Sequence, residues 1–196
     1  KYNVVLKNFY SNPACVDFDF FSPQKRKKQS LIDKFNLQNK VICVYAGKFG
    51  GSYLTKEIFE FLKVAENFFG RENFKALIFT NHNTEDLKIW QKGSGLGEDT
   101  VTSLFVPYQE IPDYIGLGDF GLVPFKPVPS KRFGTPIKTG EYWAMGLPVV
   151  ITKNISDDSD IIMENKIGAV IESLDEKGYI NAILKIDSIL KNFSHK

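Results

Sequence analysis

The stretch Val41-Ile42-Cys43-Val44-Tyr45-Ala46-Gly47-Lys48-Phe49-Gly50-Gly51-Ser52-Tyr53-Leu54-Thr55 decides the fold of this chain. The six hydrophobic residues from Val41 to Ala46 predict a strand that is buried on both faces. A glycine-rich loop follows. From Thr55 to Phe69 hydrophobic residues recur at spacings of three and four, which predicts an amphipathic helix that Thr55 can cap. A buried strand, a loop and a helix in this order begin a βαβ unit.

The same alternation continues to the end of the chain. We predict six strands, at Val41–Ala46, Lys75–Thr80, Val101–Val106, Phe120–Phe125, Leu147–Thr152 and Gly168–Ile171. We predict helices between and after them, at Thr55–Phe69, Thr84–Gly93, Gln109–Ile115, Ile137–Met145, Asp157–Asn165 and Glu176–Leu190. Strands separated by helices pair in parallel, so the expected fold is α/β, a Rossmann-like, doubly wound parallel sheet of about six strands.

Residues 1–40, here called the lead-in, differ from the rest. Val4–Pro23 is predicted to be extended and Gln24–Phe35 to be a helix. That helix would open on the basic run at residues 25–28, which we interpret as a solvated face rather than a membrane contact. We predict one ligand-binding domain after the lead-in, at residues 41–196. Because the chain begins at Lys1 without Met, we expect a piece of a longer protein or a processed product.

Composition narrows the class of function. Lys and Arg number 25 against 23 Asp and Glu, and the net charge of +2 is too small for a protein whose whole surface binds nucleic acid. No apolar run approaches the roughly 20 residues that cross a bilayer, and no signal peptide is recognisable. Cys15 and Cys43 lack the spacing of a disulfide framework or a zinc site. We expect them to be small buried side chains of a cytoplasmic protein.

Two loops are candidates for a ligand site, because ligands of open parallel sheets bind beyond the carboxyl ends of the strands. The first is Gly47–Thr55, where adjacent glycines and a helix start suit a phosphate group. It lacks the spacing of a Walker loop. A glycine-rich turn without a ligand is the open alternative.

The second candidate is Thr135–Val150. Pro136 suits a helix entrance and Gly146 a helix stop. Lys138 and Glu141 share one helix face, and a cation in the first turn opposes the helix dipole unless an anion is held there. Glu141 can accept two hydroxyl hydrogen bonds at once. An ordinary surface pair is the open alternative.

Other familiar motifs are set aside. Gly116–Gly121 matches G-x-G-x-x-G, but it follows a predicted helix and opens a strand, which excludes a dinucleotide fingerprint. The only histidines are His82 and His195. We interpret His82 as a loop residue, and no residues have the spacing of metal ligands.

Three stretches together carry a resemblance to a known family. Asn12–Pro23 is similar to an interdomain segment written N-G-V-D and then F-x-P, and Gly47–Gly51 to a glycine-rich turn that faces a diphosphate. Ser130–Val150 contains the signature P-x-K-x-x-E-Y-x-A-x-G-x-P-V. In this order they resemble the C-terminal, donor-binding half of retaining glycosyltransferases of the GT-B fold, the group that includes glycosyltransferase family four.

The resemblance implies one half of a GT-B fold and a site for a nucleotide-sugar. It implies that Glu141 binds the ribose hydroxyls and that Lys48 and Lys138 hold the diphosphate. These three are the expected catalytic residues, because they stabilise the leaving nucleoside diphosphate without a metal or other cofactor. The residues expected to bind the donor are Gly50, Gly51, Asn81, Val106, Thr135, Pro136, Ile137, Lys138, Glu141 and Tyr142. The turn from Val106 to Ile111 is expected to recognise the base.

The chain also departs from the family. A second acidic residue often lies eight positions before the ribose-binding glutamate and contacts the sugar. Here that position is Phe133, or Lys131 if the Phe-Gly pair is aligned. Lys48 stands for an arginine of the first loop, and Lys56 lies too far along to equate with its lysine. The acceptor-binding N-terminal half is expected to be absent from this chain.

We therefore predict the donor-binding domain of a bacterial, metal-independent hexosyltransferase that moves a sugar, with retention, from a UDP- or GDP-sugar to a glycan or lipid-linked acceptor. Capsule or lipopolysaccharide synthesis at the inner face of the membrane is the expected setting. Membrane contact would come only through the absent half, and no nucleic acid is involved. The fragment alone is expected to be inactive. A non-catalytic nucleotide-binding or scaffold domain of the same fold and a nonhydrolysing sugar-nucleotide epimerase are the alternatives.

Overall fold

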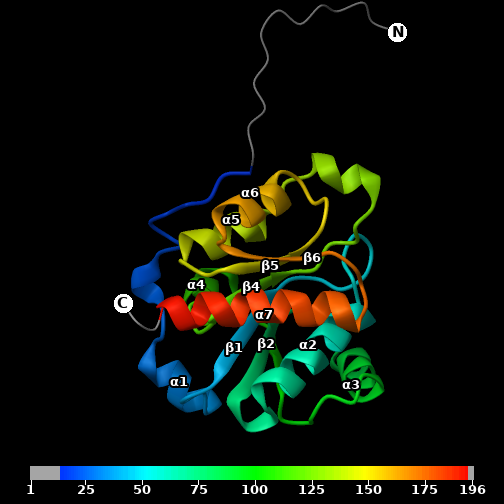
Figure 1. Cartoon of the computed structure of the whole chain (residues 1–196). Helices are drawn as coiled ribbons and strands as arrows, with labels where there is room; N and C mark the ends of the chain where they lie inside the picture. Colours follow the sequence, from blue (N-terminus) through cyan, green and yellow to red (C-terminus); the bar gives the residue numbers. More distant parts are fainter. Residues whose placement is uncertain (1–13, 194–196) are drawn as a thin grey trace, which may run out of the picture.

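The computed structural model describes residues 14–193, which form a six-stranded parallel sheet in the order β3-β2-β1-β4-β5-β6 (Figure 1). The strands are β1 (Val41–Ala46), β2 (Phe74–Phe79), β3 (Val101–Leu104), β4 (Phe120–Val123), β5 (Val149–Thr152) and β6 (Gly168–Ile171). This confirms the predicted Rossmann-like, doubly wound sheet. Residues 4–13 of the predicted extended segment, and His195, lie outside the described residues.

Strand β1 lies at the centre of the sheet. It pairs along its whole length with β2, from Val41 opposite Phe74 to Ala46 opposite Phe79, and with β4 on its other side. Its side chains alternate between two hydrophobic clusters, one on each face of the sheet. Both faces are therefore buried, which explains the unbroken hydrophobic run in the sequence.

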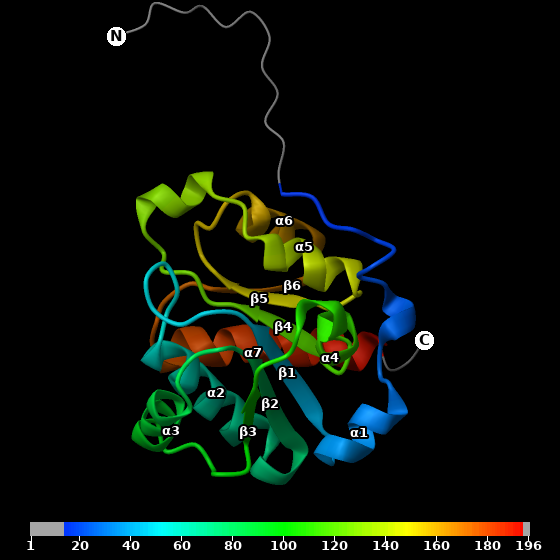
Figure 2. The ribbon, with the colours of Figure 1, turned by 180° about the vertical axis from the view of Figure 1, so that it is seen from behind.

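Helices cover both faces. They are α1 (Gln29–Phe35), α2 (Lys56–Phe69), α3 (Thr84–Gly93), α4 (Ile111–Ile115), α5 (Ile137–Ala144), α6 (Asp158–Asn165) and α7 (Glu176–Phe193). Side chains of α2, α3 and α7 belong to one cluster, and those of α1, α4, α5 and α6 to the other. Helices α2 and α7 lie in front of the sheet in Figure 1, and Figure 2, seen from behind, brings α4 to the front.

The strand boundaries shift where proline interrupts the ladder. Strand β4 ends at Val123 rather than Phe125 because Pro124 follows it, and β5 begins after Pro148 rather than at Leu147. Proline has no N–H to donate to a neighbouring strand. Helix α2 begins at Lys56, and the Thr55 side chain makes no capping hydrogen bond.

The interpretation of the basic run as a solvated helix face is wrong. Helix α1 begins only at Gln29, and Lys27 has a positive φ of 53°. Arg26 donates to the carbonyl oxygens of Gly118 (3.2 Å) and Gly146 (3.1 Å). Lys27 Nζ lies 2.7 Å from Asp119 Oδ1. These cations fasten the lead-in to the domain.

The turn at Gly116–Gly121 has a structural reason for its glycines. The turn connects α4 to β4, which confirms the prediction that this segment follows a helix and opens a strand. A Cβ at Gly116 would lie 2.7 Å from the Lys25 carbonyl oxygen, and one at Gly118 would lie 2.7 Å from Val44. Close approach of the lead-in and β1 therefore requires glycine here.

The cysteines differ from each other. Cys43 is buried in β1, as predicted, whereas Cys15 is exposed, which corrects that part of the prediction.

Arg26→Ala should lower the free energy of unfolding by roughly 1–3 kcal/mol, because the variant leaves the buried Gly118 carbonyl without its charged donor. For a chain of this size the unfolding midpoint should fall by about 3–10 °C in a thermal melt. Lys92→Ala, at an exposed position of α3, is the matched control and should change the midpoint little. Equal effects of the two substitutions would contradict the fastening role.

Candidate functional site

A cleft of about 650 Å³ opens at the carboxyl ends of β1, β2 and β3, beside the first turn of α5. Chain order reverses on either side of β1, so the cleft lies at the topological switch point where doubly wound sheets bind ligands. Its lining residues are Gly47, Lys48, Tyr53, Phe79, Thr80, Asn81, Phe105, Val106, Tyr108 and Lys138.

The glycine-rich loop after β1 is held by backbone hydrogen bonds. Gly50 and Gly51 have positive φ angles of 76° and 60°, which glycine adopts without strain. The Tyr53 N–H donates to the Gly50 carbonyl at 3.0 Å and closes the turn. The hydroxyl of Tyr45, in β1, donates a hydrogen bond to the Lys48 carbonyl oxygen. The loop thus presents the exposed Lys48 side chain at the cleft.

Helix α5 supplies the second cation. Pro136 precedes its first residue, Ile137, as predicted from the sequence, and Gly146 ends it with a φ of 71°. Lys138 lies in the first turn and lines the cleft. Its Nζ is 4.0 Å from Glu141 Oε2, which confirms that the two side chains share a face.

Glu141 is a desolvated carboxylate. Only 7% of the residue is exposed, and burial raises the pKa of its carboxyl group while the nearby Lys138 charge opposes the rise. Lys138 is its only ion-pair partner in residues 14–193, and no hydrogen bond to its carboxylate is formed there. A buried carboxylate with so little compensation costs stability, which is typical of a ligand site rather than a surface pair.

The other predicted site residues fall into two groups. Lys48, Asn81, Val106 and Lys138 line the cleft together. The backbone positions predicted to bind the donor lie in the adjoining loop and helix start but outside the lining. They are Gly50, Gly51, Thr135, Pro136 and Ile137.

Tyr142 requires a correction. Its side chain is fully buried, so it has no access to a donor molecule. The ring occupies the space beside Gly121, where a Cβ would lie 2.5 Å from it, and the hydroxyl accepts a hydrogen bond from the Ala46 N–H at 3.0 Å. Its position next to Glu141 in the signature reflects the docking of α5 onto β1 and β4.

Sequence reasoning missed several aromatic residues of the cleft. Phe105 and Tyr108 are 69% and 60% exposed at its edge, and Tyr53 lines it from the first loop. The lead-in contributes too, because the Phe20 ring stacks on Tyr108 with centroids 5.0 Å apart. The signal that the sequence offered for Phe105 was an aromatic residue close to the carboxyl end of a predicted strand.

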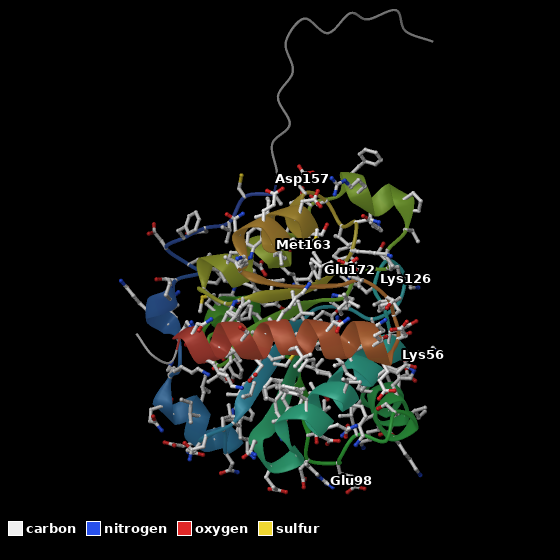
Figure 3. The ribbon with its side chains drawn as sticks, in the orientation of Figure 1. Lys56, Glu98, Lys126, Asp157, Met163 and Glu172 are labelled. Atoms are coloured by element: carbon white, nitrogen blue, oxygen red, sulfur yellow. The ribbon has the colours of Figure 1, made fainter. Side chains whose placement is uncertain are left out.

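The departures from the family pattern have clear positions. Phe133, at the position where the family often has a second acidic residue, is 91% exposed, and its side chain carries no charge. Lys131 Nζ lies over the Phe125 ring, 5.8 Å from its centroid. Lys56 extends at the outer edge of the molecule, where its Nζ lies 3.7 Å from Glu60 (Figure 3). Lys56 is therefore not part of the cleft lining.

His82 is a loop residue, as interpreted. Its Nε2 lies 3.2 Å from Asp86, and its ring stacks on Trp90. In residues 14–193 no group of three or more His, Cys, Asp and Glu side chains is placed to hold a metal ion. No helix in this part of the chain is long and apolar enough to cross a membrane.

Comparison with known families identifies the family of this chain. A family model described as "Glucosyltransferase 3-like, C-terminal domain" matches residues 67–188, more than half of the chain. The chain belongs to this family. It is the C-terminal half of a glycosyltransferase of the GT-B fold, as the resemblance implied.

Solved structures share this fold. WaaG, a glycosyltransferase involved in lipopolysaccharide biosynthesis, is 16% identical over 86% of this chain and 44% of its own, with a TM-score of 0.66. A Rickettsia africae glycosyltransferase is 16% identical over 89% of this chain and 46% of its own, with a TM-score of 0.63. Trehalose-6-phosphate synthase from E. coli, bound with UDP-2-fluoro glucose, is 11% identical over 90% and 47%, with a TM-score of 0.58.

The chain therefore spans less than half the length of these neighbours. A search of curated proteins finds no significant match.

The raised pKa of Glu141 predicts a pH-dependent effect of Glu141→Gln. The folded protein binds the Glu141 proton more tightly than the unfolded chain does, so protonation of this carboxyl stabilises the fold. That stabilisation is fully present below the unfolded pKa and is lost as the pH rises through the higher folded pKa. The glutamine variant cannot ionise, so it should melt at a higher temperature than the wild type at about pH 8, and the difference should vanish towards about pH 4.

The matched control for this pH series is Glu172→Gln, at an exposed position. Its midpoint should follow that of the wild type across the range. A Glu141→Gln variant that melts below the wild type at about pH 8 would contradict a desolvated carboxylate.

Proposed function

We propose that this domain binds the nucleoside-diphosphate sugar of a retaining glycosyltransferase that transfers a hexose to a glycan or lipid-linked acceptor. The observation that carries the proposal is the desolvated Glu141, which lies outside the cleft lining but 4.0 Å from Lys138, a residue that lines the cleft together with Lys48. Two cations and one carboxylate match a ligand that joins a diphosphate to a pair of ribose hydroxyls.

The proposed roles follow from the chemistry of each group. Lys48 and Lys138 neutralise the diphosphate, and the Gly50–Gly51 turn and the amino end of α5 at Ile137 offer backbone N–H groups. Glu141 accepts hydrogen bonds from the vicinal ribose hydroxyls. The free-energy cost of desolvating Glu141 is already included in the stability of the unliganded domain. Hydroxyl donors of the ligand replace the hydrogen bonds to water that the carboxylate has lost, which favours binding.

The base would lie between Asn81 and Val106. The Asn81 side-chain amide can donate and accept, and the backbone at Val106 offers one donor and one acceptor. The exposed rings of Phe105 and Tyr108 provide apolar surface for the flat face of a base.

The catalytic contribution proposed for this half is electrostatic. Cleavage of the sugar–phosphate bond leaves negative charge on the nucleoside diphosphate, and fixed cations at Lys48 and Lys138 stabilise it as it develops. Orientation of an acceptor against the anomeric carbon would come from polypeptide of the kind that the longer neighbours carry.

A second candidate is a nucleotide-binding domain without transfer activity. The observation that favours it is Phe133, which stands 91% exposed where the family often has an acidic residue that contacts the sugar. Such a domain would bind nucleoside diphosphates and their sugar conjugates equally well, because no group would read the sugar.

Thermal unfolding with UDP, GDP, ADP and their common hexose conjugates tests the proposal. A ligand at a hundred times its dissociation constant adds about 2.7 kcal/mol, which should raise the midpoint by roughly 5–10 °C. One nucleotide family should give this shift in the wild type and in Glu172→Ala, and Glu141→Ala should lose it. A midpoint that no nucleotide moves would contradict donor binding.

Turnover gives a separate prediction. With the matching nucleotide-sugar and simple glycan acceptors, the 196-residue chain should release no nucleoside diphosphate above the rate without enzyme, because nothing orients the acceptor. Measurable transfer by this chain would contradict the requirement for further polypeptide.

A further inference from the structure

Tyr53 is a cleft residue with no role in the proposal so far. It lies in the glycine-rich loop and lines the same cleft as Lys48 and Lys138. The side chain is half-buried, with its ring packed on Phe125 at a centroid distance of 4.6 Å. Polar groups that are placed in this way without a partner are candidates for ligand contacts.

The backbone around Tyr53 is fixed from three sides. Its own N–H closes the turn on Gly50, the Leu54 N–H donates to the Pro124 carbonyl at 2.9 Å, and the Lys126 N–H donates to the Ser52 carbonyl at 2.9 Å. Tyr53 and Phe125 also form an isolated antiparallel bridge. A ligand would therefore meet a preorganised side chain, which lowers the entropic cost of binding.

The Tyr53 hydroxyl is an unused donor. It forms no hydrogen bond to any residue in the described range 14–193. Burial raises the pKa of Tyr53, so the hydroxyl keeps its proton at neutral pH and can donate it in a hydrogen bond.

The neighbouring groups define what this donor would meet. Lys48 and Lys138 are donors without acceptor capacity, and they line the cleft with Tyr53. Three donors on one cleft select a ligand rich in acceptors. Phosphoryl oxygens accept only, whereas sugar hydroxyls both donate and accept. Lys56 Nζ lies 3.7 Å from Glu60 Oε1, and Lys56 is not part of the cleft lining.

We propose that the Tyr53 hydroxyl donates a hydrogen bond to a non-bridging oxygen of the β-phosphoryl group of the donor's diphosphate, a group that monophosphates lack, and thereby makes the site selective for diphosphates over monophosphates. The inference rests on the proposed function. Tyr53 supplies a neutral donor from the first loop, where Lys48 supplies the charge.

Calorimetric titration of the 196-residue chain with UDP, GDP and ADP, and with the matching monophosphates, tests the assignment. Tyr53→Phe removes the hydroxyl and keeps the ring on Phe125, so the unliganded midpoint should stay within about 2 °C of the wild type. Its affinity for the preferred diphosphate should fall roughly tenfold, and its affinity for the monophosphate should change less than about twofold.

The matched control is Tyr179→Phe, which removes a hydroxyl that donates to Glu60 at 3.5 Å, because neither residue lines the cleft. It should leave both affinities unchanged. An unchanged diphosphate affinity in Tyr53→Phe, or an equal loss for monophosphate and diphosphate, would overturn the assignment.

The same titrations separate this inference from the proposed function. If the wild type binds a diphosphate and Glu141→Ala abolishes that binding while Tyr53→Phe has no effect, only the Tyr53 assignment fails. If the wild type binds none of the six nucleotides, both fail. The sugar conjugate of the preferred diphosphate is titrated as well. A loss in Tyr53→Phe that appears only with this conjugate would place the hydroxyl on the sugar and overturn the diphosphate contact.

Discussion

The hydrogen bond from the Ala46 N–H to the Tyr142 hydroxyl fixes α5 against the centre of the sheet. Ala46 is the last residue of β1, and the Tyr142 ring lies in the space that Gly121 of β4 leaves open. One side chain therefore ties a helix to two neighbouring strands at the switch point. Because Lys138 and Glu141 belong to that helix, their distance from Lys48 depends on this contact.

The site has an energetic cost that the surrounding structure must offset. Glu141 is 7% exposed with one cation 4.0 Å away, and the exposed rings of Phe105 and Tyr108 leave apolar surface in water. Each of these features destabilises the unliganded domain. The two hydrophobic clusters on the faces of the sheet supply the compensating stability, so the cost is confined to one edge.

The sequence was sufficient for the fold because each strand is a hydrophobic run and each helix has a clear period. Predictions failed where the local structure depends on contacts with residues that are distant in the sequence. The carbonyls that Arg26 contacts lie 92 and 120 residues away, so local periodicity suggested an exposed helix start instead. In the site, the structure brings Lys138 to the cleft and Glu141 within 4.0 Å of Lys138, and their roles remain predictions. Tyr142 was misplaced because adjacent residues of a helix face different directions. Tyr53 was not predicted because nothing local shows which loop side chain turns toward the cleft.

Arg26 also has a mechanical consequence. Its guanidinium bridges the turn before β4 and the turn before β5, while Lys27 forms an ion pair with Asp119 in the first of these turns. Because Arg26 and Lys27 are adjacent, separating this segment from the domain would break the bonds to both turns together rather than one after another. Residues 26 and 27 are thus a multi-point anchor at the amino edge of the sheet, opposite the carboxyl edge where the cleft opens.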